Sequence, residues 1–321
     1  MKYSKEQLLM ISGSTGFRTE IIEKVLLLMD LLEDFFSDPL LRHKIVLKGG
    51  TALNLFYLNL PRLSVDIDLN YIGAIDKITM LRERSIVEKR IFAFCERQGF
   101  SIRRQPTVHA GGKLVWRYPS ALEHTGSLEI DLNFMYRVPL LPIDTIASCK
   151  IGERSINNIS VLNINELAAG KFSALIDRAL GRDLFDSYQL LSSNLLDIET
   201  FRLILIVYLG MSRKKDIREI RAQSIVHDFK EFQDRLLPML SRQHLNKVSI
   251  QSEWAKEMLI TVQNFLQYLF PLREHEQHFL NALLDFGEIK PELLTNDVQL
   301  QDKIKLHPAV QWSAYNIKRN K

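Results

Sequence analysis

The sequence lacks the features that mark several large classes of protein. Its 321 residues contain two cysteines, Cys95 and Cys149, which are far apart in the chain. This argues against a disulfide framework or a zinc knuckle and favours a reducing compartment. No apolar run approaches the roughly 20 residues of a bilayer span, and the N-terminus shows no apolar signal region. We therefore expect a cytoplasmic protein without a membrane partner.

An excess of charge of one sign is also missing. Lysine and arginine total 42 and aspartate and glutamate 38, so the formal net charge is +4. That is too small for binding nucleic acid by bulk attraction, although a local basic cluster can still do so. Hydrophobic residues make up 46% of the chain, which excludes general disorder. The length predicts about two domains.

Hydrophobic periodicity predicts a mixed first half and a helical second half. Helices are expected at 19–36, 51–60, 76–98 and 201–209, and strands at 44–47, 64–71, 100–104, 112–118 and 127–134, the last two joined by a hairpin. Residues 138–164 are irregular, and Asn163 is expected to cap the first of the later helices. This order predicts an α+β fold, with a mixed sheet and flanking helices in domain 1–162 and an all-helical domain over 163–321.

The first candidate functional segment is Lys48-Gly49-Gly50-Thr51, between an expected strand and an expected helix. Glycines allow the backbone to approach a ligand closely, and the N–H groups that begin a helix can bind phosphate. An ordinary turn would have the same composition.

The second candidate is the alternating segment 64–71, which puts Asp66 and Asp68 on one face of a strand. Two neighbouring carboxylates favour a cation, and Mg²⁺ held by one or two carboxylates and substrate phosphates fits. An EF-hand is excluded because its sixth and twelfth positions, Gly and Glu, are Tyr71 and Lys77 here. A solvated polar face is the alternative.

A third carboxylate is available from the alternating segment 127–134. It carries Glu129 and Asp131 on one face, and a neighbouring strand could complete a two-metal site. We favour Asp131, with Glu129 second. In the helical half, Lys171 could contact a triphosphate and Asp186 could position a reacting group, although a salt-bridged surface gives the same pattern.

Together these segments resemble the AbiEii/AbiGii toxin family of the DNA polymerase β-like nucleotidyltransferase superfamily. The resemblance rests on Leu-Lys-Gly-Gly-Thr-Ala-Leu at 47–53, Arg-Leu-Ser-Val-Asp-Ile-Asp-Leu at 62–69, Lys171, and Arg-Asp-Leu-Phe-Asp at 182–186. It covers about residues 40–190.

The resemblance implies a nucleotidyltransferase toxin of a toxin–antitoxin or abortive-infection system. Such an enzyme uses an NTP with Mg²⁺ or Mn²⁺, acts on an RNA acceptor such as the 3′ end of tRNA, and has a cognate antitoxin. It implies catalytic roles for Asp66, Asp68, Lys171 and Asp186, metal binding by Asp66, Asp68 and Asp131, and nucleotide binding by Lys48, Gly49, Gly50, Thr51, Arg62 and Ser64. It further implies that the helical domain folds back to close the nucleotide cleft.

Other functions fit the same residues. The acceptor could be a small molecule or a protein hydroxyl, or the protein could be a non-catalytic nucleotide-binding regulator, which has little need for the whole set of site residues. For RNA binding, the densest basic cluster is Arg213, Lys214, Lys215, Arg218 and Arg221, with Arg82, Arg84, Lys89 and Arg90 as a second candidate. A solvated helix face is the alternative. His275 and His278 lack the zinc-protease spacing and are expected at the surface.

Overall fold

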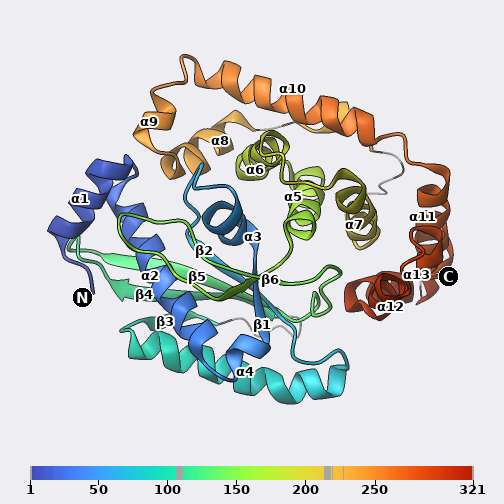
Figure 1. Ribbon diagram of the computed structural model, residues 1–321, viewed down its shortest axis with the longest axis horizontal. Helices are drawn as coiled ribbons and strands as arrows, with labels where there is room; N and C mark the ends of the chain where they lie inside the picture. Colours follow the sequence, from blue (N-terminus) through green and yellow to red (C-terminus); the bar gives the residue numbers. More distant parts are fainter. Residues whose placement is uncertain (1, 106–110, 213–217, 219, 227, 320–321) are drawn as a thin grey trace. The chain divides into compact units, whose positions relative to one another are not determined.

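The computed structural model describes residues 2–105, 111–212, 218, 220–226 and 228–319 (Figure 1). The chain folds into two compact units. The sheet unit comprises Met1–Arg137, Ile143–Leu162 and Leu237–Lys247. The helical unit comprises Val138–Pro142, Asn163–Leu236 and Val248–Lys321.

One mixed sheet forms the centre of the sheet unit. Among the described residues it has seven strands in the order β3-β4-β5-β2-β1-β7-β6. The strands are β1 (Ile45–Lys48), β2 (Asp66–Tyr71), β3 (Ser101–Arg104), β4 (Gly111–Pro119), β5 (Thr125–Asn133), β6 (Asp144–Ile146) and β7 (Ile159–Val161). The pairs β2–β5 and β1–β7 are parallel, and the other neighbours are antiparallel.

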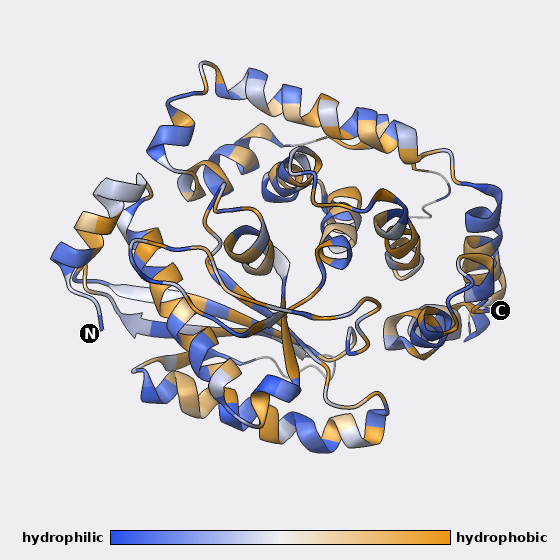
Figure 2. Ribbon diagram, in the orientation of Figure 1, coloured by the Kyte–Doolittle hydropathy of each residue, from blue (hydrophilic) through white to orange (hydrophobic). Residues whose placement is uncertain are grey.

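The apolar face of the sheet is covered by two long helices, α2 (Thr19–Ser37) and α4 (Lys77–Arg97). The alternation in β2 and β5 buries Ile67 and Ile130 completely on this face. Phe92 of α4 packs edge-on against Trp116 of β4, with ring centroids 4.8 Å apart. Figure 2 shows α2 hydrophobic along much of its length, as expected for a helix between the sheet and other elements. The core therefore lies under one face and leaves the other face for polar residues.

The predicted helix over 51–60 is wrong in its extent. The helix α3 covers only Gly49–Ala52 and continues as a π-helical turn at Leu53–Tyr57. The Asn54 side chain donates to the Gly50 carbonyl oxygen over 2.9 Å, inside the ladder of backbone hydrogen bonds. Such insertions widen a helix locally. The helix does not resume, because Asn59 and Leu60 adopt left-handed backbone conformations, with φ of +53° and +59°.

Most other predicted elements of the first half are confirmed within a residue or two at each end. Asp76 caps α4 by accepting a hydrogen bond from the Thr79 backbone N–H over 2.8 Å. The region 138–164, which the sequence leaves irregular, contains the short strands β6 and β7. The sheet unit also includes α1 (Lys5–Thr15) and α9 (Arg242–Leu245). The Leu63 N–H donates to the Met239 carbonyl oxygen over 2.9 Å, which ties the late segment 237–247 into this unit.

The helical unit contains the longer helices of the second half. They are α5 (Ile164–Arg178), α6 (Gly181–Ser192), α7 (Ile198–Gly210), α8 (Phe229–Arg235), α10 (Gln251–Leu269), α11 (Glu274–Phe286), α12 (Val298–Leu306) and α13 (Pro308–Arg319). Asn163 caps α5, and α7 is the buried helix expected near 201–209. His275 and His278 are exposed on α11, as expected.

The molecule is thus an α+β protein with a mixed sheet and flanking helices followed by a helical C-terminal part, as the sequence predicts. Across the residues that the structure describes, no helix has both the length and the apolar character to cross a membrane.

Candidate active site

Two parallel strands at the centre of the sheet carry the predicted carboxylates. The pairing of β2 with β5 sets Asp66 opposite Glu129 and Asp68 opposite Asp131. Residues two apart on a strand share a face, and so do register partners, so all four side chains lie on one face of the sheet. These four residues are called the acidic cluster below. The structure therefore brings together the carboxylates that the sequence places in two separate segments.

A lysine flanks the acidic cluster on each side. Lys48 of β1 is the register partner of Asp68, and Lys113 of β4 is the register partner of Asp131. The Nζ atom of Lys113 forms an ion pair with Glu129, 2.7 Å from its Oε2 atom. Positive charges on both sides reduce the repulsion among neighbouring carboxylates. The row across four strands is thus lysine, two aspartates, lysine.

The surroundings shift the proton affinity of two residues on this face. Burial raises the pKa of Asp131, and the charges of Asp68 and Glu129 add to the rise, against the opposing effect of Lys48 and Lys113. The hydrogen bond to Glu129 raises the pKa of Lys113, which the nearby Asp66 and Asp68 reinforce. Asp131 is therefore a carboxylate that takes up a proton more readily than an ordinary aspartate.

Gly49 lies directly against the acidic cluster at the turn from β1 into α3. Its φ is +75°, a conformation that disfavours side chains. A Cβ atom at this position would lie 2.1 Å from Oδ2 of Asp68, which is far inside contact distance. The glycine is thus required both for the turn and for the close approach of the backbone to an aspartate.

The other residues of the two motifs at 47–53 and 62–69 hold this turn in place. A Cβ on Gly50 would lie 2.8 Å from Nη2 of Arg62 and 2.9 Å from Oγ of Ser64. Arg62 is 2% exposed, and its Nη1 donates to the Leu63 carbonyl oxygen over 3.0 Å. The Thr51 hydroxyl donates to the Asp66 carbonyl oxygen over 2.5 Å, which fastens α3 to β2. The two motifs therefore form one compact substructure around the acidic cluster.

The acidic cluster has the donors that a hard divalent cation prefers. Carboxylate oxygens of Asp66 and Asp68 lie on one face, and Mg²⁺ typically takes one or two protein carboxylates and completes its shell with water or phosphate. Among the described residues, no three Asp, Glu, His or Cys side chains form a ready-made metal centre. The paired aspartates fit a cation that completes its shell with water or with substrate phosphates.

Lys171 and Asp186 lie together in the helical unit. Lys171 Nζ of α5 is 2.8 Å from Oδ2 of Asp186 and 3.2 Å from Oδ1 of Asp183, both on α6. Arg178 makes a second ion pair with Asp183, at 2.7 Å. Burial acts to raise the pKa of Asp183, but the charges of Lys171 and Arg178 outweigh it and hold that pKa below its usual value. Lys171 and the motif at 182–186 thus form a largely buried cluster in which positive and negative charges balance.

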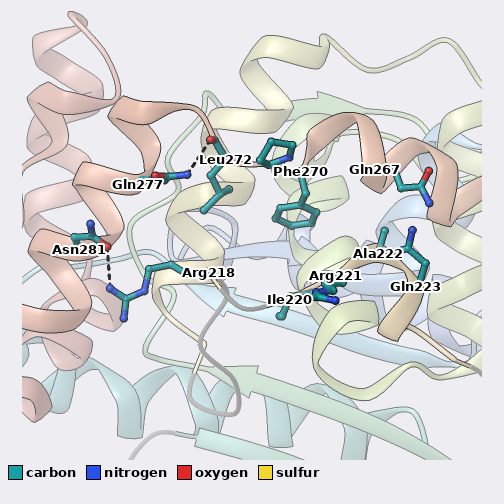
Figure 3. Close-up of a pocket in the computed structure, with 11 residues that line it drawn as sticks. Arg218, Ile220, Arg221, Ala222, Gln223, Gln267, Phe270, Leu272, Gln277 and Asn281 are labelled. Carbon is teal, nitrogen blue, oxygen red and sulfur yellow. Dashed lines mark hydrogen bonds between the residues drawn. The ribbon is translucent and has the colours of Figure 1, made fainter.

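The predicted RNA-binding cluster is only partly described by the structure. Arg213, Lys214 and Lys215 lie outside the described residues. Arg218 and Arg221 line a cavity of about 550 Å³ in the helical unit, together with Phe270 and several amide side chains (Figure 3). Arg218 donates to Asn281 over 2.8 Å and to Asp285 over 2.6 Å. Its charge is therefore already paired, whereas Arg221 is exposed.

Sequence reasoning missed two charged residues of these clusters. Lys113 lies in a segment predicted as a strand, but only the β4–β5 register reveals that it faces the carboxylates. Asp183 belongs to the 182–186 motif, and its buried pairing with Lys171 shows why a second aspartate is there. Three-residue spacing on a predicted helix was the available signal for Asp183 and Asp186.

The paired aspartates beside a Gly-Gly turn match the arrangement that the sequence resemblance implies for a nucleotidyltransferase. Residues 30–268 match the family described as nucleotidyl transferase AbiEii toxin, type IV toxin–antitoxin system, and the chain belongs to that family. A solved structure, the nucleotidyltransferase toxin MenT4 from Mycobacterium tuberculosis, is similar in fold. Its TM-score is 0.60 at 18% sequence identity, with 95% of this chain and 98% of that chain covered. No curated protein matches the sequence. The predicted family is confirmed.

Proposed function

We propose that this nucleotidyltransferase toxin transfers a nucleotide from an NTP to an RNA acceptor in a Mg²⁺-dependent reaction, with the 3′ end of tRNA as the leading candidate. The observation that carries the proposal is the acidic cluster, in which Asp66 and Asp68 share a face with Asp131 beside Gly49. We also propose the cytoplasm as its place of action, a cognate antitoxin as its partner, and residues 1–162 and 163–321 as its domains.

In this reaction the acceptor hydroxyl oxygen bonds to the α-phosphorus of the NTP while the bond from that phosphorus to the bridging oxygen breaks. Pyrophosphate leaves with the electron pair of the broken bond. The proton of the acceptor hydroxyl passes to a carboxylate of the acidic cluster. Asp131, which lies beside Asp68 on the neighbouring strand, is the candidate acceptor.

Asp66 and Asp68 would hold the cation, with Asp131 as the third carboxylate. When bound, Mg²⁺ neutralises the charge that develops on the phosphate oxygens. Lys48 flanks the cluster and supplies a fixed positive charge toward the triphosphate. Gly49 and Gly50 let the backbone of the turn come close to the phosphates, and Arg62, Ser64 and Thr51 keep that turn in shape.

Lys171 and Asp186 remain proposed catalytic residues on the strength of the motif. Lys171 pairs with Asp183 as well as with Asp186, so removing Lys171 or Asp186 disturbs the charge balance of a buried ionic cluster. Loss of activity in Lys171→Ala is therefore informative only when the melting temperature is measured on the same sample.

The test uses purified protein with each α-labelled NTP in turn, with and without total RNA. Asp66→Ala and Asp68→Ala should each lower transfer at least about 1,000-fold, because several kcal/mol of transition-state stabilisation is lost. Their circular dichroism spectra should match the wild type, and their melting temperatures should match it or rise slightly, since mutual repulsion is removed. Glu96→Gln, an exposed carboxylate on α4, is the control and should keep full activity.

The labelled product identifies the acceptor. Label in the tRNA band supports RNA transfer, whereas label on protein alone indicates a protein hydroxyl. No transfer with any NTP would favour a nucleotide-binding regulator. Wild-type activity in either aspartate variant would show that the acidic cluster is not the active site.

A further inference from the structure

The ion pair between Lys113 and Glu129 divides the acidic cluster into two kinds of carboxylate. Lys113 of β4 is the register partner of Asp131 of β5. The Lys113 Nζ atom nevertheless pairs with Glu129, which lies two residues before Asp131 on β5, at 2.7 Å. The Lys113 side chain is 60% exposed and that of Glu129 is 39% exposed. One of the four carboxylates is therefore neutralised by a lysine from the neighbouring strand.

This division has a chemical consequence for a small cation. Mg²⁺ requires near-ideal octahedral geometry and takes few protein carboxylates. Asp131 and Glu129 lie on the same face of β5, one beside Asp68 and one beside Asp66, so either could serve as the third carboxylate. Glutamate has the longer and more flexible side chain, and it would compete with Asp131 unless another group engaged it. Lys113 is the group that engages it.

We propose that Lys113 is a positioning residue that holds Glu129 out of the metal site and so leaves Asp131 as the third carboxylate. The inference rests on the proposed function and deepens it, because it assigns different roles to two carboxylates that the sequence offers as first and second choice for the same role. It also gives Lys113 a role that does not require contact with the substrate.

The proposal predicts an unusual pattern in a double-mutant cycle. Lys113→Ala frees Glu129 to compete with Asp131 for the cation, so kcat should fall about 10-fold. Glu129→Gln leaves Lys113 without its partner and beside Asp131, its register partner, so kcat should fall as well. In Lys113→Ala/Glu129→Gln both disturbances disappear, and kcat should return to within about 3-fold of wild type. Coupling of this sign is expected only for residues that act on each other.

A second readout needs no turnover. Mn²⁺ binding to the nucleotide-free protein, followed by electron paramagnetic resonance, should tighten about 10-fold in Lys113→Ala, because a positive charge is removed and a carboxylate is released. The double variant should bind Mn²⁺ as the wild type does. Lys113→Arg should behave like wild type in both assays, since arginine can keep the ion pair.

Arg117→Ala is the matched control. Arg117 is exposed on the same strand and face as Lys113, but its register partner on β5 is Ser127 and not a carboxylate. Its removal changes the net charge equally and should leave both kcat and Mn²⁺ binding unchanged.

Two results would overturn the proposal. If Lys113→Ala raises KM for the NTP and Glu129→Gln does not rescue it, Lys113 contacts the phosphates instead. If the fall in kcat of the double variant equals the combined falls of the two single variants, the ion pair has only a structural role. If wild type transfers no nucleotide but the Mn²⁺ cycle behaves as described, the proposed function fails while the role of Lys113 is supported.

Discussion

At the scale of the residue, Gly49 shows how a local signal acquires its meaning from a distant strand. The sequence predicts a glycine turn at this position but gives no reason for Gly49 itself to be irreplaceable. The β1–β2 pairing supplies the reason, because it brings Asp68 so close that a Cβ would lie 2.1 Å from its Oδ2 atom. The glycine turn can therefore be predicted from neighbouring residues alone, whereas its close approach to Asp68 can be seen only in the folded sheet.

This close approach leads to a prediction for Gly49→Ala. The methyl group must displace Asp68 or the turn, so we expect transfer to fall at least about 100-fold, since small displacements of a catalytic group are costly. Gly99→Ala is the control, because Gly99 has φ +84° but a Cβ there would meet no atom of the described residues within 4 Å. Both variants should lose about 1–2 kcal/mol of stability from the left-handed conformation. Only Gly49→Ala should lose activity, and equal activity in both would contradict the close approach.

At the scale of the element, alternation and periodicity predict the long strands and helices but not the short ones. β2 and β5 alternate over six and nine residues, and the sequence predicts both. β6 and β7 have three residues each, too few for any period to be recognised, and they are strands because they complete a sheet edge next to β1. α3 likewise passes after four residues into a π-helical turn, which hydrophobic periodicity does not reveal.

The α5–α6 ion cluster yields a prediction on stability and pH. Asp183→Asn removes a buried carboxylate that pairs with Arg178 and with Lys171, while Lys171 keeps its ion pair with Asp186, so we expect a loss of about 2 kcal/mol at pH 7. The folded-state pKa of Asp183 lies below its usual 3.8, so its contribution is present above about pH 3.8 and is lost as the pH falls through the folded value. The difference between wild type and variant should therefore shrink below about pH 4.

Urea unfolding from pH 3 to pH 8, followed by circular dichroism, measures this difference. Glu199→Gln serves as the control because Glu199 is an exposed partner of Arg273, and its removal should change little at any pH. A difference for Asp183→Asn that grows as the pH falls would contradict the assigned direction of the pKa shift.

At the scale of the whole molecule, composition and order predict the fold class but not the assignment of every segment. Residues 237–247 lie deep in the helical half of the sequence, yet they belong to the sheet unit through hydrogen bonds from Leu63 and to Gly16. No local pattern signals such a return of the chain, since it depends on tertiary interactions. The boundary at residue 162 and the roles of the individual site residues stay predictions.

The small net charge of the chain makes RNA binding a local question. At +4, the molecule offers little general attraction for phosphates, so an acceptor RNA must find a cluster of cations. Two arginines of the alternative cluster are already engaged, because Arg84 pairs with Glu88 at 2.7 Å and Arg90 with Asp38 at 2.8 Å. In the cluster at 213–221, Arg218 is likewise paired with Asp285, and that cluster stays the leading prediction because it is the densest in the sequence.

We therefore expect the members of this cluster to differ in their effect on RNA binding. Changing Arg213, Lys214 and Lys215 together to Gln should raise KM for RNA and leave KM for NTP unchanged. The slope of log affinity against log salt should become shallower by about 2, because each phosphate that is no longer neutralised reduces the slope by about 0.7–0.9. Arg221→Gln should flatten it by about 0.7–0.9, the share of a single phosphate. Arg218→Gln, the internal control, should change the slope little because its charge already has a partner. Lines that superimpose for wild type and the triple variant would place the acceptor on another surface, and an effect of Arg218→Gln equal to that of Arg221→Gln would show that RNA competes successfully with Asp285 for the guanidinium.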